Sequence, residues 1–157
     1  MIFLLKKRFY LLIVILTLLI GCSSTPKPPP PLVLSVRANA QANNGELFYF
    51  VVKTANEKQF MLETYQDVAS KAFSDPPDPA GLGVFSIVPG TKQDYSVSQP
   101  AEGTIALYFL FTKPGSQWKK LLAMPFEEEY IINLKATGQV DIERDKPWYD
   151  FFEKIND

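Results

Sequence analysis

The sequence predicts a mainly β domain, a single β-sandwich with one inserted helix and a short C-terminal helix. Three observations support this fold class. Short apolar runs rich in β-branched and aromatic residues recur between residues 32 and 143. Turn residues separate these runs at intervals of about ten residues, as in β-sandwiches. Residues 57–73 instead repeat their apolar positions every three or four residues, which is the period of a helix.

The first two strands are predicted at residues 32–38 and 46–53. In the first, alternate residues from Leu32 to Ala38 are apolar, as in a strand with one buried face. The second is an unbroken apolar and β-branched run, which is typical of a strand covered on both faces. Asn43, Asn44 and Gly45 lie between them and predict a turn, because Asn and Gly tolerate positive φ.

The inserted helix is expected to end at the proline-rich segment 74–79, because proline has no N–H group to donate. Further strands are predicted at residues 84–88, 94–98 and 105–111, and a closing hairpin at 130–136 and 139–143. Residues 105–111 are the most apolar of these segments, so we expect them at the centre of a sheet. Residues 118–124 fit either a strand or an irregular segment.

The C-terminal segment has an aromatic character of its own. After Pro147, the residues Trp148, Phe151, Phe152 and Ile155 follow helical spacing, which predicts a short amphipathic helix over 147–155. We expect this helix to pack on the sandwich; the alternative is that it binds a partner.

Residues 1–21 have the organisation of a cleaved signal peptide. A basic cluster at residues 6–8 precedes an apolar run of 12 residues from Phe9 to Ile20. A membrane-spanning helix needs about 20 apolar residues, so cleavage is favoured over a spanning anchor. Leu19 to Cys22 then resembles the lipobox of bacterial lipoproteins. This resemblance implies cleavage before Cys22 and acylation of its thiol and its new amine; the alternative is an inert cysteine.

Residues 22–31 are interpreted as a lipidated tether. Four consecutive prolines, Pro28 to Pro31, favour an extended polyproline II segment. At about 3.1 Å per residue, residues 23–31 would reach about 28 Å from a bilayer. In a Gram-negative cell, Ser23 after the cysteine implies transport to the outer membrane, facing the periplasm, by resemblance to lipoprotein sorting rules.

Residues 32–157 have the length of one domain and fold without an internal disulfide, because Cys22 is the only cysteine. Three of the 16 basic residues and none of the 17 acidic ones precede Cys22, so residues 22–157 carry a net charge of −4. This charge disfavours nucleic-acid binding.

The residue types needed for most catalysis and metal binding are missing. The sequence contains no histidine, no glycine-rich phosphate loop and no nucleophile elbow. Asp75 and Asp78 share a proline-rich loop, but they supply too few oxygen ligands to predict a calcium site. We therefore expect no enzymatic activity, no metal and no cofactor apart from the acyl chains on Cys22.

The order of these features resembles the outer-membrane lipoprotein of the bacterial type VI secretion system, the TssJ family. The resemblance runs from Cys22 to about Glu143. It rests on the turn at residues 43–45, the helix opened by Phe60, the apolar strand at 105–111, and Trp118-Lys119 where the family usually has Trp-Arg. It implies a transthyretin-like sandwich that is not an enzyme.

The resemblance also implies a partner, the periplasmic domain of the large inner-membrane secretion subunit. The family places its contacts in loops at one end of the sandwich, so Asn43, Asn44 and Gly45 are the first candidate contact residues. Asp75 and Asp78 in the loop after the helix are the second. Two alternative functions stay open: a secretin pilot or other envelope-assembly lipoprotein, and a carrier of a small apolar ligand.

Overall fold

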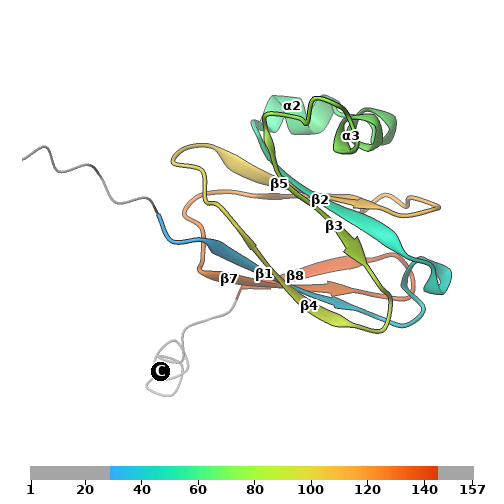
Figure 1. The fold of residues 1–157 in the computed structure, drawn as a ribbon. Helices are drawn as coiled ribbons and strands as arrows, with labels where there is room; N and C mark the ends of the chain where they lie inside the picture. Colours follow the sequence, from blue (N-terminus) through green and yellow to red (C-terminus); the bar gives the residue numbers. More distant parts are fainter. Residues whose placement is uncertain (1–28, 145–157) are drawn as a thin grey trace, which may run out of the picture.

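A computed structural model describes residues 29–144 of the chain, which form two four-stranded sheets packed face to face (Figure 1). A 3₁₀ turn follows the first strand, and two short helices follow the second. The elements in chain order are β1 (Leu32–Ala38), η1 (Ala42–Gly45), β2 (Phe48–Ala55), α2 (Glu57–Leu62), α3 (Tyr65–Ala72), β3 (Gly81–Ile87), β4 (Lys92–Val97), β5 (Thr104–Leu110), β6 (Lys119–Leu122), β7 (Glu129–Leu134) and β8 (Val140–Arg144).

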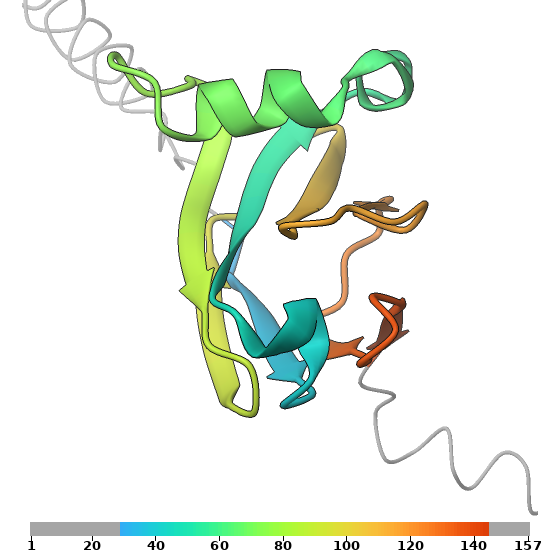
Figure 2. The same ribbon diagram turned by 90° about the vertical axis from the view of Figure 1, so that its right-hand side faces the viewer.

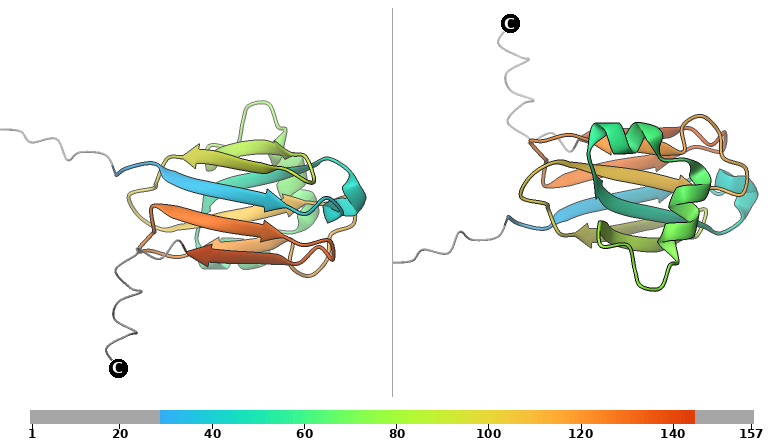
Figure 3. Two further views of the ribbon diagram at one scale, coloured as in Figure 1. Left: turned by 90° about the horizontal axis from the view of Figure 1, so that it is seen from below. Right: turned by 90° about the horizontal axis from the view of Figure 1, so that it is seen from above.

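Sheet A has the strand order β4-β1-β7-β8, and sheet B has the order β3-β2-β5-β6. β1 and β7 are parallel, and every other neighbouring pair is antiparallel. Figure 3 shows sheet A from below and sheet B, with its helices, from above. The predicted fold class, a mainly β sandwich, is confirmed.

The main core fills the space between the sheets. The alternate apolar residues of β1 form a buried face, as predicted, because Leu32, Leu34 and Val36 all lie in this layer. From sheet B, Phe50 and Phe109 lie directly opposite each other on neighbouring strands and stack at 5.0 Å between ring centroids. Burial of side chains of this size contributes about 1.5–3 kcal/mol each, and this layer is the main source of stability.

A second apolar layer covers the outer face of sheet B. Val51 and Tyr108 belong to a separate buried cluster that also contains Val68 of α3. Figure 3 shows α3 lying over this face of sheet B. This layer explains why β2 and β5 have long apolar runs, since most residues on both of their faces are buried. β5 lies inside sheet B, between β2 and β6, as its composition predicted.

The segment predicted as one helix over 57–73 divides into two. Glu63 has extended dihedral angles, and Thr64 begins α3 with a capping box in which Thr64 and Asp67 exchange hydrogen bonds. The break changes the direction of the chain, so the predicted apolar stripe does not hold throughout. Met61 is 73% exposed and Phe73 is 58% exposed.

The sandwich has two different ends. At the end that we call the terminal end, β1 begins and β8 finishes, because Leu34 pairs with Tyr130 and Tyr130 pairs with Arg144. The opposite end, here called the η1 end, carries η1 and the turns β3–β4, β5–β6 and β7–β8. Figure 2 looks onto the η1 end.

The closing hairpin and the β6 strand lie close to their predicted positions. β7 and β8 pair through Leu134 and Val140, and β6 covers four residues of the segment 118–124. The predicted signal peptide, most of the tether including Cys22, and the helix over 147–155 lie outside the described residues. Within residues 29–144, no helix is long and apolar enough to cross a membrane.

Candidate functional site

The first candidate contact segment, residues 43–45, forms an unusual left-handed turn. Asn43, Asn44 and Gly45 have φ values of 50°, 58° and 79°. Asparagine and glycine are the residues that adopt this region most readily, and a β-branched residue here would be strained. The turn lies at the η1 end, where Asn44 and Gly45 are exposed to solvent.

Asn43 differs from its two neighbours because its side chain points inward and is buried. Its Nδ2 donates to the carbonyl oxygen of Glu46 at 3.0 Å and to Thr112 Oγ1 at 3.2 Å. Its Oδ1 accepts a hydrogen bond of 2.8 Å from the backbone N–H of Thr112. The side chain of Asn43 therefore connects η1 to the segment after β5, and of the three turn residues only Asn44 and Gly45 are exposed.

The second candidate segment, which contains Asp75 and Asp78, lies at the other end of β2. The backbone N–H of Thr54, near the end of β2, donates to the carbonyl of Ala80 at 2.9 Å, whereas η1 lies before the start of β2. The structure therefore does not bring the two predicted segments together. Asp75 is exposed, but Asp78 is only partly exposed and is engaged in an ion pair.

Asp78 belongs to a buried charged cluster beneath the helices. Lys53 Nζ lies 2.9 Å from Glu63 Oε1 and 2.8 Å from Asp78 Oδ2. The hydroxyl of Tyr108 donates to the second oxygen of Glu63. In residues 29–144, no buried side-chain nitrogen or oxygen lacks a hydrogen-bond partner, so the cluster is fully satisfied.

The pKa shifts in this cluster follow from its pairing. Burial alone would lower the pKa of Lys53, but the hydrogen bonds and charges of Asp78 and Glu63 outweigh burial and raise it. Burial would raise the pKa of both carboxyls, yet hydrogen bonds from Tyr108 and Lys53 to Glu63, and from Lys53 to Asp78, hold them below their usual range. Burial and the adjacent Glu63 raise the pKa of Tyr108. All three charged groups stay ionised near neutral pH, which suits a structural role.

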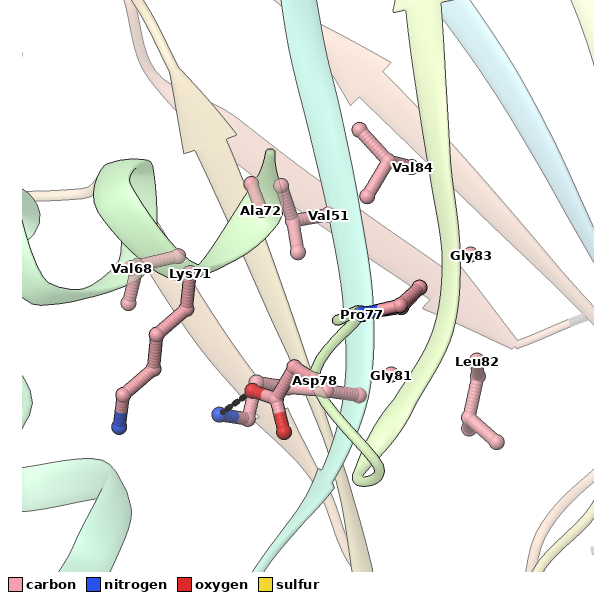
Figure 4. Close-up of a pocket in the computed structure, with 11 residues that line it drawn as sticks. Val51, Val68, Lys71, Ala72, Pro77, Asp78, Gly81, Leu82, Gly83 and Val84 are labelled. Carbon is pink, nitrogen blue, oxygen red and sulfur yellow. Dashed lines mark hydrogen bonds and ion pairs between the residues drawn. The ribbon is translucent and has the colours of Figure 1, made fainter. Parts of the chain in front are cut away.

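A cavity of about 270 Å³ lies beside this cluster, between α3, the loop before β3 and the outer face of sheet B (Figure 4). Val51, Val68, Ala72 and Val84 supply apolar walls, and Lys71 lies at its rim. Pockets for small ligands usually measure about 300–1,000 Å³, so this cavity is below that range. Among the described residues, no group of three or more acidic, histidine or cysteine side chains is placed to hold a metal ion.

An exposed apolar surface adjoins the η1 turn. Leu47, Tyr49, Val84 and Val88 lie on or beside the outer face of β2 and β3, with exposed fractions of 51%, 38%, 41% and 45%. The ring of Phe73, which follows α3, contacts the ring of Tyr49 at 4.8 Å between centroids. We call these five residues the η1-end patch. Its residues are separated by as much as 41 positions in the sequence, so no local sequence pattern reveals it.

The comparisons with known proteins agree with this architecture. The family model described as IglE, N-terminal domain, matches residues 49–134, which is more than half of the chain. The chain belongs to the IglE N-terminal domain family. The match runs from β2 into β7, so it contains the helices, the charged cluster and most of the η1-end patch. No curated protein matches the chain by sequence.

Solved structures extend the likeness of this IglE-family chain to nearly the whole sandwich. The T6SS lipoprotein TssJ1 from Pseudomonas aeruginosa is 13% identical with a TM-score of 0.58, over 76% of this chain and 99% of that one. Lip from Serratia marcescens, a membrane-bound component of the Type VI Secretion System, is 17% identical with a TM-score of 0.57 over the same shares. A chain of a Type VI membrane complex is 12% identical with a TM-score of 0.58, over 73% and 98%. The fold predicted from the TssJ resemblance is therefore confirmed.

The pair Trp118-Lys119, on which part of that resemblance rests, has a clear structural role in the IglE-family region. Lys119 Nζ donates to the carbonyl oxygens of Phe60 at 2.6 Å and Glu63 at 3.0 Å, at the C-terminal end of α2. A cation at this end of a helix satisfies carbonyls that have no partner inside the helix. The ring of Trp118 contacts Tyr65 of α3 at 5.3 Å. Lys119 therefore attaches α2 to sheet B, and Trp118 attaches α3.

Proposed function

We propose that this IglE-family protein is an outer-membrane lipoprotein that anchors a type VI secretion membrane complex by binding the periplasmic domain of its inner-membrane subunit. The observation that carries the proposal is that the start of β1 and the η1 turn lie at opposite ends of the sandwich. The chain enters β1 at the terminal end, whereas the η1 turn lies at the other end (Figure 1). Leu47 and Tyr49 of the η1-end patch follow this turn directly, and Tyr49 pairs with Leu110 at the end of β5. A domain held from the terminal end presents the η1 end to a partner across the periplasm.

The anchor in this proposal is the acylated Cys22. Each buried CH₂ group contributes about 0.8 kcal/mol to membrane binding, so two or more acyl chains hold the protein stably. The tether over residues 22–31 then gives the domain its reach from the outer membrane. Tethering raises the effective concentration of the domain near its partner, so a modest interface is sufficient.

The docking surface in this proposal is the η1-end patch together with the exposed part of the η1 turn. Contiguous exposed apolar side chains on a soluble domain are typical of a protein-binding surface. Asn44 and Gly45 present polar groups at the edge of this surface, as the rim of an interface requires. The solved structures support the secretion role, since they include a membrane-bound component of the Type VI Secretion System and a Type VI membrane complex.

The proposal needs neither a catalytic residue nor a cofactor. The buried cluster of Lys53, Glu63 and Asp78 is the strongest concentration of ionisable groups among the described residues, and its members satisfy one another. The protein acts by binding alone.

The experiment that tests the proposal compares two exposed apolar side chains at opposite ends. Leu47 in the η1-end patch and Met124 in the β6–β7 loop are both 51% exposed. The full-length lipoprotein is purified from detergent extracts of its host, as the original chain and as Leu47→Asp and Met124→Asp. We expect an inner-membrane secretion subunit to co-purify with the original and with Met124→Asp, and to be lost from Leu47→Asp.

The same extracts test the anchor and the alternatives. Mass spectrometry should find Cys22 at the N-terminus with acyl chains, and Cys22→Ser should leave the outer-membrane fraction. Recovery of a secretin ring in place of the inner-membrane subunit would support a pilot function instead. Equal loss of the partner from both aspartate variants would contradict docking at the η1 end.

A further inference from the structure

The two lateral sides of the sandwich are closed to different degrees. On one side, β3 and β4 are the edge strands, and Phe85 stacks on Tyr95 at 4.3 Å between ring centroids. On the other side, β6 and β8 are the edge strands, and a cavity of about 390 Å³ lies between them. We call this cavity the β6–β8 groove. Its lining includes Arg144, the last residue that the structure describes.

The edge of the main core lines the groove, and its residues Leu122 and Tyr130 are themselves buried. Leu122 and Lys120 of β6 pair with the buried core residues Ile105 and Leu107, so both face the core layer. Because Ile142 and Arg144 pair with Ile132 and Tyr130, they face the same layer from β8. The groove therefore has an apolar centre, formed by Leu122, Tyr130 and Ile142, between two inward-facing basic side chains.

These two basic side chains have weak partners among the described residues. Lys120 Nζ donates to the neutral amide oxygen of Gln117 at 3.0 Å. Arg144 lies 3.9 Å from Glu127, and its side chain is 64% exposed. An acidic and apolar segment is the occupant whose chemistry fits such a groove.

We propose that residues 147–155 of this same chain occupy the β6–β8 groove. This segment begins three positions after Arg144, which itself lines the groove, and the two linking residues can reach at most about 7 Å, so the segment starts close to the groove. A helix of nine residues is about 13 Å long, and the four residues of β6 span about the same length.

The composition of the segment matches the groove. Trp148, Phe151, Phe152 and Ile155 form the stripe that would cover the apolar centre. Residues 147–155 contain two acidic side chains, Asp150 and Glu153, and one basic side chain, Lys154, so the segment has a net charge opposite in sign to that of the two basic side chains of the groove. Such a docked helix would close this side of the sandwich as Phe85 and Tyr95 close the other.

The test uses the tryptophan that the segment contains. The chain has two tryptophans, and Trp118→Phe leaves Trp148 as the only one. In the full lipoprotein in detergent, we expect Trp148 to emit at shorter wavelength than in urea and to be quenched several-fold less by acrylamide. Lys120→Glu and Arg144→Glu, combined, should restore strong quenching. The matched control is Lys92→Glu, on the exposed edge strand β4.

Disulfide trapping provides a second measurement that does not depend on the basic residues. Ala123→Cys, at the exposed rim of the groove, is combined in turn with cysteine at each position from 148 to 155. We expect cross-links within one chain at positions three or four apart. Three results would each overturn the proposal. The first is that acrylamide quenches Trp148 as strongly in the folded protein as in urea, and the second is that Lys120→Glu and Arg144→Glu together leave this quenching unchanged. The third is that the cross-links form only between two chains. Circular dichroism confirms that every variant is folded.

Discussion

Lys53 on β2 and Glu63 between the two helices form an ion pair of 2.9 Å in which both side chains are more than 90% buried. Asp78 completes the cluster from the loop before β3. The three residues belong to sheet B, the helical segment and the loop that returns to the sheet. The cluster therefore connects the helices to the sandwich by charge, in addition to the apolar layer around Val68.

We predict that Lys53→Met destabilises the domain strongly. The substitution leaves two carboxylates close together without their cation, and breaking a buried ion pair in this way typically costs about 3–5 kcal/mol. Urea unfolding followed by circular dichroism measures the change. Lys92→Met, in an exposed position, is the control and should change stability by less than about 0.5 kcal/mol.

The same cluster predicts a stability plateau with two limits in pH. Glu63 and Asp78 have folded pKa values below their ordinary values of 4.5 and 3.8, so the stability they contribute is present above those values and is lost as the pH falls through the folded pKa. Lys53 and Tyr108 have folded pKa values above their ordinary 10.5 and 10.0, so their contribution is present below those values and is lost as the pH rises through the folded pKa.

Urea midpoints measured across the acid and alkaline ranges test this plateau. In Glu63→Gln, the acid limb should become shallower, because the variant has no carboxyl at this position to protonate. A Glu63→Gln profile that falls as steeply in acid as that of the original chain would contradict the assignment.

Asn43 and Asn44 form a matched pair for a third prediction. Both have left-handed φ values, so alanine introduces similar backbone strain at each position. Only Asn43 also loses buried hydrogen bonds, to Thr112 and to the carbonyl of Glu46. We expect Asn43→Ala to be less stable than Asn44→Ala by about 1–3 kcal/mol in urea unfolding. Equal losses would show that the side chain of Asn43 does not hold the turn.

Lys119 provides a fourth prediction, which concerns the end of α2. Lys119→Met removes a charged donor from the carbonyls of Phe60 and Glu63 and should cost about 1–3 kcal/mol. Lys119→Arg keeps a cation and donors at this position and should cost less. Lys58→Met on the exposed surface of α2 controls for the loss of charge. Amide hydrogen exchange should increase in residues 57–63 for Lys119→Met alone.

Much of the fold could be predicted because strands and helices leave their periods in the sequence. The alternation in β1 indicated its buried face, and the unbroken apolar run of β2 indicated coverage on both sides. The break at Glu63 was missed, because the capping box of Thr64 and Asp67 lies inside a segment without glycine or proline. Capping residues were the available signal for this break.

The candidate site was less predictable. Asn43, Asn44 and Gly45 were correctly recognised as a turn, but the burial of Asn43 depends on Thr112, which is 69 positions away. Asp78 was interpreted as a loop residue, and its carboxylate is held by Lys53, 25 positions earlier. As contacts for a partner, all five predicted residues remain predictions.

The sequence by itself determined the order of strands and turns and the alternation of buried and exposed residues in the strands. It also determined that the chain has no histidine and, with a single cysteine, no internal disulfide. These are local or compositional properties. Only the tertiary structure decided that the η1 turn and the loop of Asp75 and Asp78 lie at opposite ends, and that Leu47, Tyr49 and Phe73 share one surface. The physical reason is that strand pairing and direction come from the packing of the whole chain. Residues far apart in sequence become neighbours only when both sheets have closed over the core.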